Sequence, residues 1–259
     1  MSLMRRVIAC LDVRDGRVVK GTRFVALRDV GDPVELAARY EAEGADEVMF
    51  LDIGATPEAR ATRLKTAERA ATRLSIPLTI GGGIRSVADM ADALRAGADK
   101  VSVNSAAVLR PALITECSAQ FGAQCVVASI DVARSGAGAR GARHVFVGGG
   151  RIATRLDAVA WARECVARGA GEILLTSIDR DGVRDGFDLE LTRAVSDAVN
   201  VPVIASGGAG SASHVCEVLG RGGADAALVA GILHDGVTTV REIKAAMRAA
   251  TLPVREVAA

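Results

Sequence analysis

Short apolar runs alternate with longer amphipathic stretches along the whole chain. Residues 7–11 and 173–175 are nearly continuous apolar runs, which are typical of parallel strands covered on both faces. Eight such runs predict strands at 7–12, 47–52, 77–80, 100–103, 125–131, 172–177, 201–205 and 226–230.

The stretches between these runs predict helices. Asp32 precedes Pro33 at one helix start, as an N-cap precedes a first-turn proline. Glycine follows several helical patterns, as at Gly44, Gly97 and Gly169. Eight strand–helix units predict an α/β fold, a closed (β/α)₈ TIM barrel, because doubly wound sheets usually have about five or six strands. The predicted helices are 33–44, 58–74, 86–96, 111–121, 156–169, 188–199, 212–220 and 238–250.

The chain also repeats itself. Residues 76–86 resemble residues 201–211, and Pro77 and Pro202 occupy the same place in the two, 125 residues apart. Residues 43–47 resemble 168–172 at the same offset. Such a repeat predicts a single barrel domain over 1–259, built from two half-barrels at about 1–121 and 122–259.

Composition limits the function classes. The 259 residues carry a net charge of +1, so nothing in the charge favours nucleic acid or an anionic membrane, and any phosphate recognition must be local. The apolar runs are too short to span a bilayer, and the first residues lack a signal-peptide layout. The five cysteines are scattered and the three histidines are far apart, which predicts reduced thiols in the cytoplasm and no metal site.

Two aspartates occupy equivalent places in the half-barrels. Asp12 ends the first predicted strand and Asp131 ends the fifth, so they should face each other across the barrel mouth, where barrel active sites lie. Such a pair suits general acid–base catalysis, although a lone aspartate after a strand more often caps a turn. Asp52 and Asp179 also follow strands but break the repeat, so we expect them to hold loops by hydrogen bonds.

Two glycine runs predict phosphate binding. Gly82 and Gly83 follow the third strand, Gly207 and Gly208 follow the seventh, and each run precedes a helix. Glycine lets backbone N–H groups approach an anion at a helix start. One run alone is weak evidence, but two symmetry-related runs predict a substrate with a phosphate at each end. Asn104 and Gly231, after the fourth and eighth strands, would complete the two phosphate cradles.

Several motifs together resemble the cyclase (synthase) subunit of imidazole glycerol phosphate synthase. They are CLDVRDGRVVKG at 10–21 and the stretches 27–33, 97–104, 171–182 and 204–210, and the resemblance covers nearly the whole chain. It implies a reaction of ammonia with a phosphoribulosyl-formimino-aminoimidazole-carboxamide ribotide. The products would be imidazole glycerol phosphate and aminoimidazole carboxamide ribotide, and the chemistry needs no metal or redox cofactor.

The resemblance also implies roles for individual residues. Asp12 and Asp131 would be the acid–base pair, and Lys20, on a long loop after the first strand, would help to close over substrate. The glycines would bind phosphate. The residues that would line the site are Asn104, Thr176, Asp181 and Ser206.

A partner subunit is a further implication. In this family a glutaminase docks on the opposite face of the barrel and supplies ammonia, forming a heterodimer. Asp99 would contact that partner. The family also has a ring of charged residues that acts as a gate at the ammonia entrance. The positions that match it are Arg6, Glu47, Lys100 and Glu172. The alternative is that these four residues form an ordinary solvated ring of charges.

Four positions depart from the family pattern, and two other functions stay open. Arg23 stands where Asn is usual, Gly54 where Thr is usual, Arg155 where Gly is usual, and Gly231 where Ser is usual. One alternative is a related barrel that delivers ammonia to another phosphorylated substrate. The other is a non-catalytic barrel that binds phosphates or activates a glutaminase, which the presence of both central aspartates disfavours.

Overall fold

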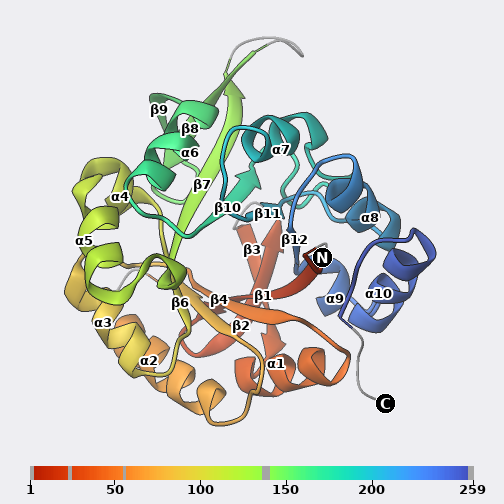
Figure 1. The fold of residues 1–259 in the computed structure, drawn as a ribbon. Helices are drawn as coiled ribbons and strands as arrows, with labels where there is room; N and C mark the ends of the chain where they lie inside the picture. The colour runs from red at the N-terminus through yellow and green to blue at the C-terminus, as the bar shows by residue number, and fades with distance from the viewer. Residues whose placement is uncertain (1–2, 23–24, 55–56, 136–140, 256–259) are drawn as a thin grey trace.

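Eight parallel strands close into a barrel with helices around its outside (Figure 1). The computed structural model describes residues 3–22, 25–54, 57–135 and 141–255. Pairing of β7 with β10 closes the barrel, which confirms the predicted fold class. The barrel strands, in order around the barrel, are β1 (Arg6–Arg14), β4 (Glu47–Asp52), β5 (Leu78–Gly81), β6 (Lys100–Val103), β7 (Val126–Ser135), β10 (Glu172–Ser177), β11 (Val203–Ser206) and β12 (Ala226–Val229).

The predicted helices are all present, with ends that differ by a few residues. Asp32 caps α1 by accepting hydrogen bonds from the backbone N–H groups of Val34 and Glu35, and Pro33 begins the helix. The short helices α4 (Ser105–Leu109) and α9 (Gly231–His234) were not predicted, because four or five residues show no helical period. The longer helices are α1 (Pro33–Ala42), α2 (Pro57–Ala71), α3 (Val87–Arg95), α5 (Ala112–Phe121), α6 (Ala158–Ala167), α7 (Leu189–Ser196), α8 (Ala212–Gly220) and α10 (Val240–Ala249).

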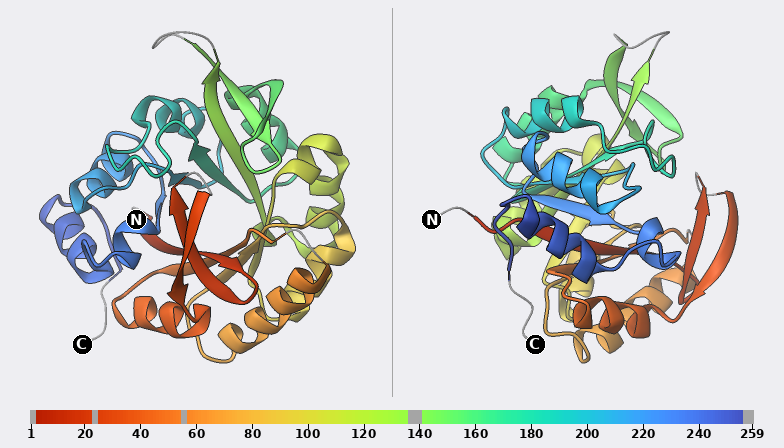
Figure 2. Two further views of the ribbon diagram at one scale, coloured as in Figure 1. Left: turned by 180° about the vertical axis from the view of Figure 1, so that it is seen from behind. Right: turned by 90° about the vertical axis from the view of Figure 1, so that its right-hand side faces the viewer.

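Antiparallel extensions follow the first and fifth barrel strands, and the first of them takes the place of the expected loop. β1 continues to Arg14 and pairs with β2 (Arg17–Thr22), which pairs with β3 (Val25–Gly31). Asp15 and Gly16 form the turn with φ of 51° and 77°, as a two-residue type I′ hairpin turn requires. β7 likewise continues into β8 (Ala142–Val147) and β9 (Ile152–Asp157). Both extensions project beyond the barrel (Figure 2).

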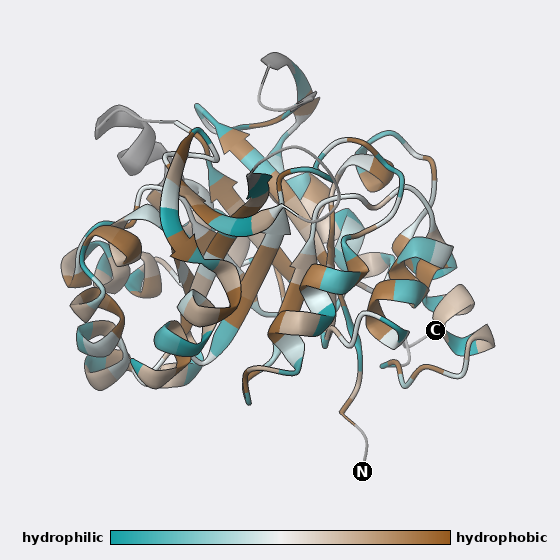
Figure 3. Cartoon of the chain, turned by 90° about the horizontal axis from the view of Figure 1, so that it is seen from above, coloured by the Kyte–Doolittle hydropathy of each residue, from teal (hydrophilic) through white to brown (hydrophobic). Residues whose placement is uncertain are grey.

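The barrel has two hydrophobic layers. The larger lies between the strands and the surrounding helices, and a smaller one fills the barrel interior. Apolar colouring accordingly follows many of the strand ribbons in Figure 3. Across the described ranges, no helix is both long and apolar enough to cross a membrane. The smaller layer consists of Ile8, Cys10, Met49, Val127, Leu174, Ile204, Ala226 and Leu228.

Candidate active site

Strand alternation directs both predicted aspartates into the barrel mouth. Side chains two residues apart on a strand share a face. Cys10 and Val127 belong to the interior layer. Asp12 lies two residues after Cys10, and Asp131 lies four residues after Val127, so both side chains point to the barrel interior. The two carboxylates therefore lie on opposite sides of the same mouth, where the parallel pairing of β1 and β7 with their barrel neighbours ends.

Three neighbouring strands bring further predicted residues to the same level. Thr176 of β10 is in register with Asp131 of β7 and with Ser206 of β11. All three are partly accessible, unlike the fully buried positions just below them. The strand ends therefore bring a carboxylate and two hydroxyls together along one side of the mouth.

Asn104 contacts Asp131 directly. Its Nδ2 donates a hydrogen bond to Asp131 Oδ2 over 2.9 Å. The Oδ1 atom of Asn104 is buried and has no hydrogen-bond partner within the described residues. A buried acceptor without a donor costs free energy. Asn104 thus presents an acceptor that a bound substrate could satisfy.

Burial and mutual repulsion raise the pKa values of the carboxyl groups in the mouth. The pKa of Asp12 rises to about 7, mainly through burial and then through the charge of Asp181. The pKa of Asp131 rises to about 6, again mainly through burial, with Asn104 opposing and Asp181 adding to the shift. Burial also raises the pKa of Asp181, against a stabilising hydrogen bond from the Gly182 backbone. Asp12 and Asp131 therefore titrate much closer to neutral pH than ordinary carboxyl groups do.

Each glycine run has a packing reason for glycine. A Cβ on Gly82 would lie 2.0 Å from the carbonyl oxygen of Asp52, and one on Gly207 would lie 2.6 Å from that of Ser177. Gly82 and Gly207 also have φ of +86° and +89°. The two contacts are equivalent, because Gly207 and Ser177 each lie 125 residues after Gly82 and Asp52. Close strand packing therefore requires these glycines even before any phosphate is considered.

Gly83 and Gly208 complete the two runs, with φ of +67° and +106°. A Cβ on Gly208 would meet the Gly186 carbonyl oxygen at 2.2 Å. Gly82 and Gly83 thus lie in the same half of the barrel as Asn104, and Gly207 and Gly208 lie in the other half. Their binding of phosphate stays a prediction.

Asp52 and Asp179 hold backbone groups, in agreement with the sequence prediction. Asp52 Oδ1 accepts from the N–H of Gly54 over 2.8 Å, and Asp179 Oδ2 accepts from the N–H of Arg134 over 3.0 Å. Gly54 is one of the four departures from the family pattern. Two others are Arg155, which is exposed on β9, and Arg23, which lies outside the described residues.

Lys20 lies at the cradle that contains Gly231, on strand β2 rather than on the expected loop. Its Nζ donates to the Gly231 carbonyl oxygen over 3.3 Å and pairs with Asp235. Arg28 and Arg184 also pair with Asp235. Sequence reasoning did not single out Asp235, Arg28 or Arg184, because no spacing links positions so far apart in the chain.

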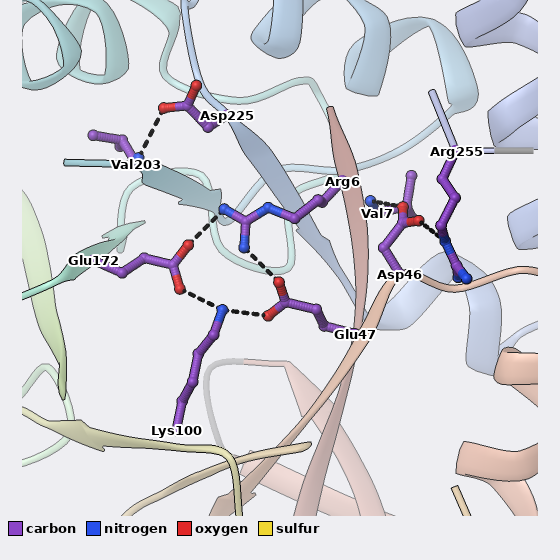
Figure 4. Close-up of polar contacts among 9 residues, drawn as sticks. All are labelled: Arg6, Val7, Asp46, Glu47, Lys100, Glu172, Val203, Asp225 and Arg255. Atoms are coloured by element: carbon purple, nitrogen blue, oxygen red, sulfur yellow. Dashed lines mark hydrogen bonds and ion pairs between the residues drawn. The ribbon is translucent and has the colours of Figure 1, made fainter. Parts of the chain in front are cut away.

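The four predicted gate residues form a closed ring of alternating charge at the strand starts (Figure 4). Arg6 contacts Glu47 and Glu172 at 2.5 Å each. Lys100 contacts the same two carboxylates at 2.9 Å each. Burial alone would lower the pKa of Arg6, but Glu172 and Glu47 outweigh burial and raise it. The ring is therefore a paired network, not a set of separate solvated charges.

Asp99 has a structural contact of its own. Its Oδ2 accepts from the N–H of Leu78 over 2.8 Å, just as Asp225 Oδ2 accepts from that of Val203 over 3.1 Å. Leu78 and Val203 are 125 residues apart. Asp99 thus holds the first residue of β5 in one half as Asp225 holds the first residue of β11 in the other. The contact of Asp99 with a partner stays a prediction.

Comparison with known proteins identifies the family. The family described as "Histidine biosynthesis protein" matches residues 6–239. The chain belongs to this family. Three similar proteins each carry the name imidazole glycerol phosphate synthase subunit HisF, which confirms the resemblance that the motifs indicated. These relatives are from Myxococcus xanthus (67% identical, covering 98% of each chain), Acidobacterium capsulatum (59%, 98% of each) and Metallosphaera sedula (57%, 97% of this chain and 98% of the relative).

Proposed function

We propose that this histidine biosynthesis protein is the cyclase subunit of an imidazole glycerol phosphate synthase. The observation that carries the proposal is the pair Asp12 and Asp131, which face one barrel mouth with pKa values raised to about 7 and about 6. High identity to HisF subunits over 98% of the chain supports it. The proposed substrate is a phosphoribulosyl-formimino-aminoimidazole-carboxamide ribotide.

The two aspartates divide the proton transfers. Ammonia adds to the ketose carbonyl and water leaves. The new nitrogen then attacks the formimino carbon, and the aminoimidazole carboxamide ribotide leaves. Loss of a proton from the CH2 group beside the former carbonyl carbon completes the aromatic imidazole ring. Asp12 and Asp131, with pKa values raised to about 7 and about 6, share these transfers: one carboxyl group holds a proton for the departing oxygen or nitrogen, and the other accepts protons from the attacking nitrogen. Asn104 orients Asp131 through its hydrogen bond.

The two phosphates of the substrate bind at opposite sides of the mouth. One lies at Gly82 and Gly83 beside Asn104, and the other lies at Gly207 and Gly208 beside Gly231. Positive φ at the glycine runs and the cations near Gly231 support these positions. Thr176, Asp181 and Ser206 line the space between, where the ketose portion passes the aspartates.

A glutaminase partner docks at the strand starts and supplies ammonia through the barrel. Along β1, the inward positions run from Arg6 in the charged ring through Ile8 and Cys10 to Asp12. An apolar interior favours neutral ammonia over ammonium, because burying an unpaired charge is costly. The ring Arg6, Glu47, Lys100 and Glu172 is the gate, and the name "subunit" of the relatives supports a multi-subunit enzyme.

Incubation of the purified protein with the ribotide substrate and an ammonium salt at alkaline pH tests the proposal. Formation of imidazole glycerol phosphate and aminoimidazole carboxamide ribotide in equal amounts is the expected result. If the ribotide is bound but not converted, the barrel is non-catalytic. If it is neither bound nor converted, the chain acts on another substrate.

A further inference from the structure

Three cations converge on one carboxylate at the barrel mouth. Asp235 Oδ2 contacts Lys20 of β2 and Arg184 of the segment before α7, and its Oδ1 contacts Arg28 of β3. We call these residues the Asp235 cluster. The hydrogen bond from Lys20 is the main reason that the pKa of Asp235 falls to about 2, so this carboxylate is ionised at neutral pH.

The Asp235 cluster lies directly over Gly231. Lys20 Nζ and Arg184 Nη2 both reach the Gly231 carbonyl oxygen, at 3.3 and 3.4 Å. A Cβ on Gly231 would lie 3.5 Å from Lys20 Nζ and 3.6 Å from Arg184 Nη2. Two cations therefore border the face of Gly231 that lacks a side chain.

The charge of the cluster matches a phosphate. Three cations and one carboxylate leave an excess of two positive charges, and a phosphate monoester carries about −1.5 to −2 at neutral pH. Lysine and arginine both bind phosphate oxygens well. The cations beside Gly231 already donate to the carboxylate of Asp235. A phosphate that binds beside Gly231 would therefore compete with Asp235 for the same donors.

The cluster also bridges separate elements. β3 pairs only with β2 in the described sheet, and β2 reaches the barrel through two residue pairs with β1, Val13 with Val18 and Arg14 with Arg17. Lys20 and Arg28 tie this extension to the residue that follows α9 on the barrel rim. Asp235 thus joins the hairpin to the barrel.

We propose that Asp235 is a specificity-determining residue that competes with the substrate phosphate for the same cations. Its carboxylate holds Lys20 and Arg184 beside Gly231, and through Lys20 and Arg28 it latches the β2–β3 extension to the rim. A phosphate at Gly231 takes over these donors and releases Asp235. This inference rests on the proposed phosphate site at Gly231.

Asp235→Asn tests the inference, with binding of inorganic phosphate measured by calorimetry at neutral pH. The variant keeps the side-chain size and removes the competing charge. Phosphate should bind roughly twofold to fivefold more tightly to the variant, the range expected for charge pairs that are partly exposed to solvent. Asp15→Asn is the matched control, because Asp15 is an exposed aspartate of the same extension and pairs with the neighbouring Arg14. It should leave phosphate affinity unchanged.

Two further measurements separate the site from the latch. Arg184→Ala should weaken phosphate binding, which identifies the measured site as the one at Gly231. Hydrogen exchange without ligand should be faster in β2 and β3 of Asp235→Asn than in wild type or Asp15→Asn. If Asp235→Asn binds phosphate as tightly as wild type or more weakly, Asp235 does not compete with phosphate, although the phosphate site at Gly231 stands. No phosphate binding to either protein, or none sensitive to Arg184, would overturn the phosphate site and the inference together. Unchanged exchange in β2 and β3 would refute the latch.

Discussion

Asn104 donates from Nδ2 to Asp131 Oδ2 across 2.9 Å, joining the ends of two adjacent strands at the barrel mouth. The bond lowers the pKa of Asp131 against the effect of burial. The amide therefore favours the ionised form of Asp131. Asn104 is a positioning residue for that carboxylate as well as a candidate contact of the substrate.

Asn104→Leu should raise the pKa of Asp131, because it removes the donor and leaves burial unopposed. The acidic limb of the pH profile of kcat/KM should move to higher pH, while the basic limb stays in place. The measurement is ammonia-dependent turnover as a function of pH with free ammonia held constant. A purely structural role for Asn104 would instead lower the rate equally at every pH.

The raised pKa of Asp12 should also appear in folding stability. A carboxyl group whose pKa is about 7 in the folded protein, against an ordinary value of 3.8, binds more protons when folded than when unfolded. Its contribution is therefore favourable at low pH and is lost as pH rises from about 4 to about 7. Urea unfolding across this range should show less loss of stability for Asp12→Asn than for wild type. The same slope in both proteins would contradict the shift.

Two anions should bind in the mouth. A crystal soaked in phosphate or sulfate should show one at Gly82 and Gly83 with Asn104, and one at Gly207 and Gly208 with Gly231. Backbone N–H groups at glycine-rich turns are suited to such anions. Density at neither position would refute the two-phosphate interpretation of the glycine runs.

Lys100→Ala should disturb the delivery of ammonia more than the chemistry. Lys100 bridges Glu47 and Glu172, at the far end of the barrel from the aspartates. Glutamine-dependent turnover with the glutaminase present should fall, while turnover with added ammonium salt should change much less. Arg5→Ala is the matched control, because Arg5 pairs with Asp225 at the same end but lies outside the ring. Equal losses in both assays would exclude a gate role for Lys100.

The sequence predicts the barrel well, because each strand–helix unit carries its own local signals. Caps such as Asp32 and the inward alternation that ends at Asp12 are set by a few neighbouring residues. The 125-residue offset is also visible in the contacts of Gly82 and Gly207 with preceding strands. The exact division into half-barrels near residues 121 and 122 stays a prediction.

The extensions and the Asp235 cluster were missed for different reasons. The Asp15–Gly16 turn was a readable hairpin signal, but the motif around it was interpreted as a loop that closes over substrate. Asp235 gave no signal at all, because its partners Lys20 and Arg184 are 215 and 51 residues away. Only closure of the barrel brings them together.

Replacement of either mouth aspartate by asparagine tests whether the pair is catalytic. Asp12→Asn and Asp131→Asn should each keep the fold, because asparagine has nearly the same size. Loss of acid–base catalysis should lower turnover by a factor of about 10²–10⁴. Asp179→Asn is the matched control, because Asp179 holds the backbone of Arg134 and should retain turnover close to that of wild type.

The most direct test is ammonia-dependent conversion of the ribotide by wild type and these three variants, with folding checked by circular dichroism. We expect imidazole glycerol phosphate from wild type and Asp179→Asn, and almost none from Asp12→Asn or Asp131→Asn. Turnover near the wild-type rate in either Asp12→Asn or Asp131→Asn would remove that aspartate from the mechanism and contradict the account.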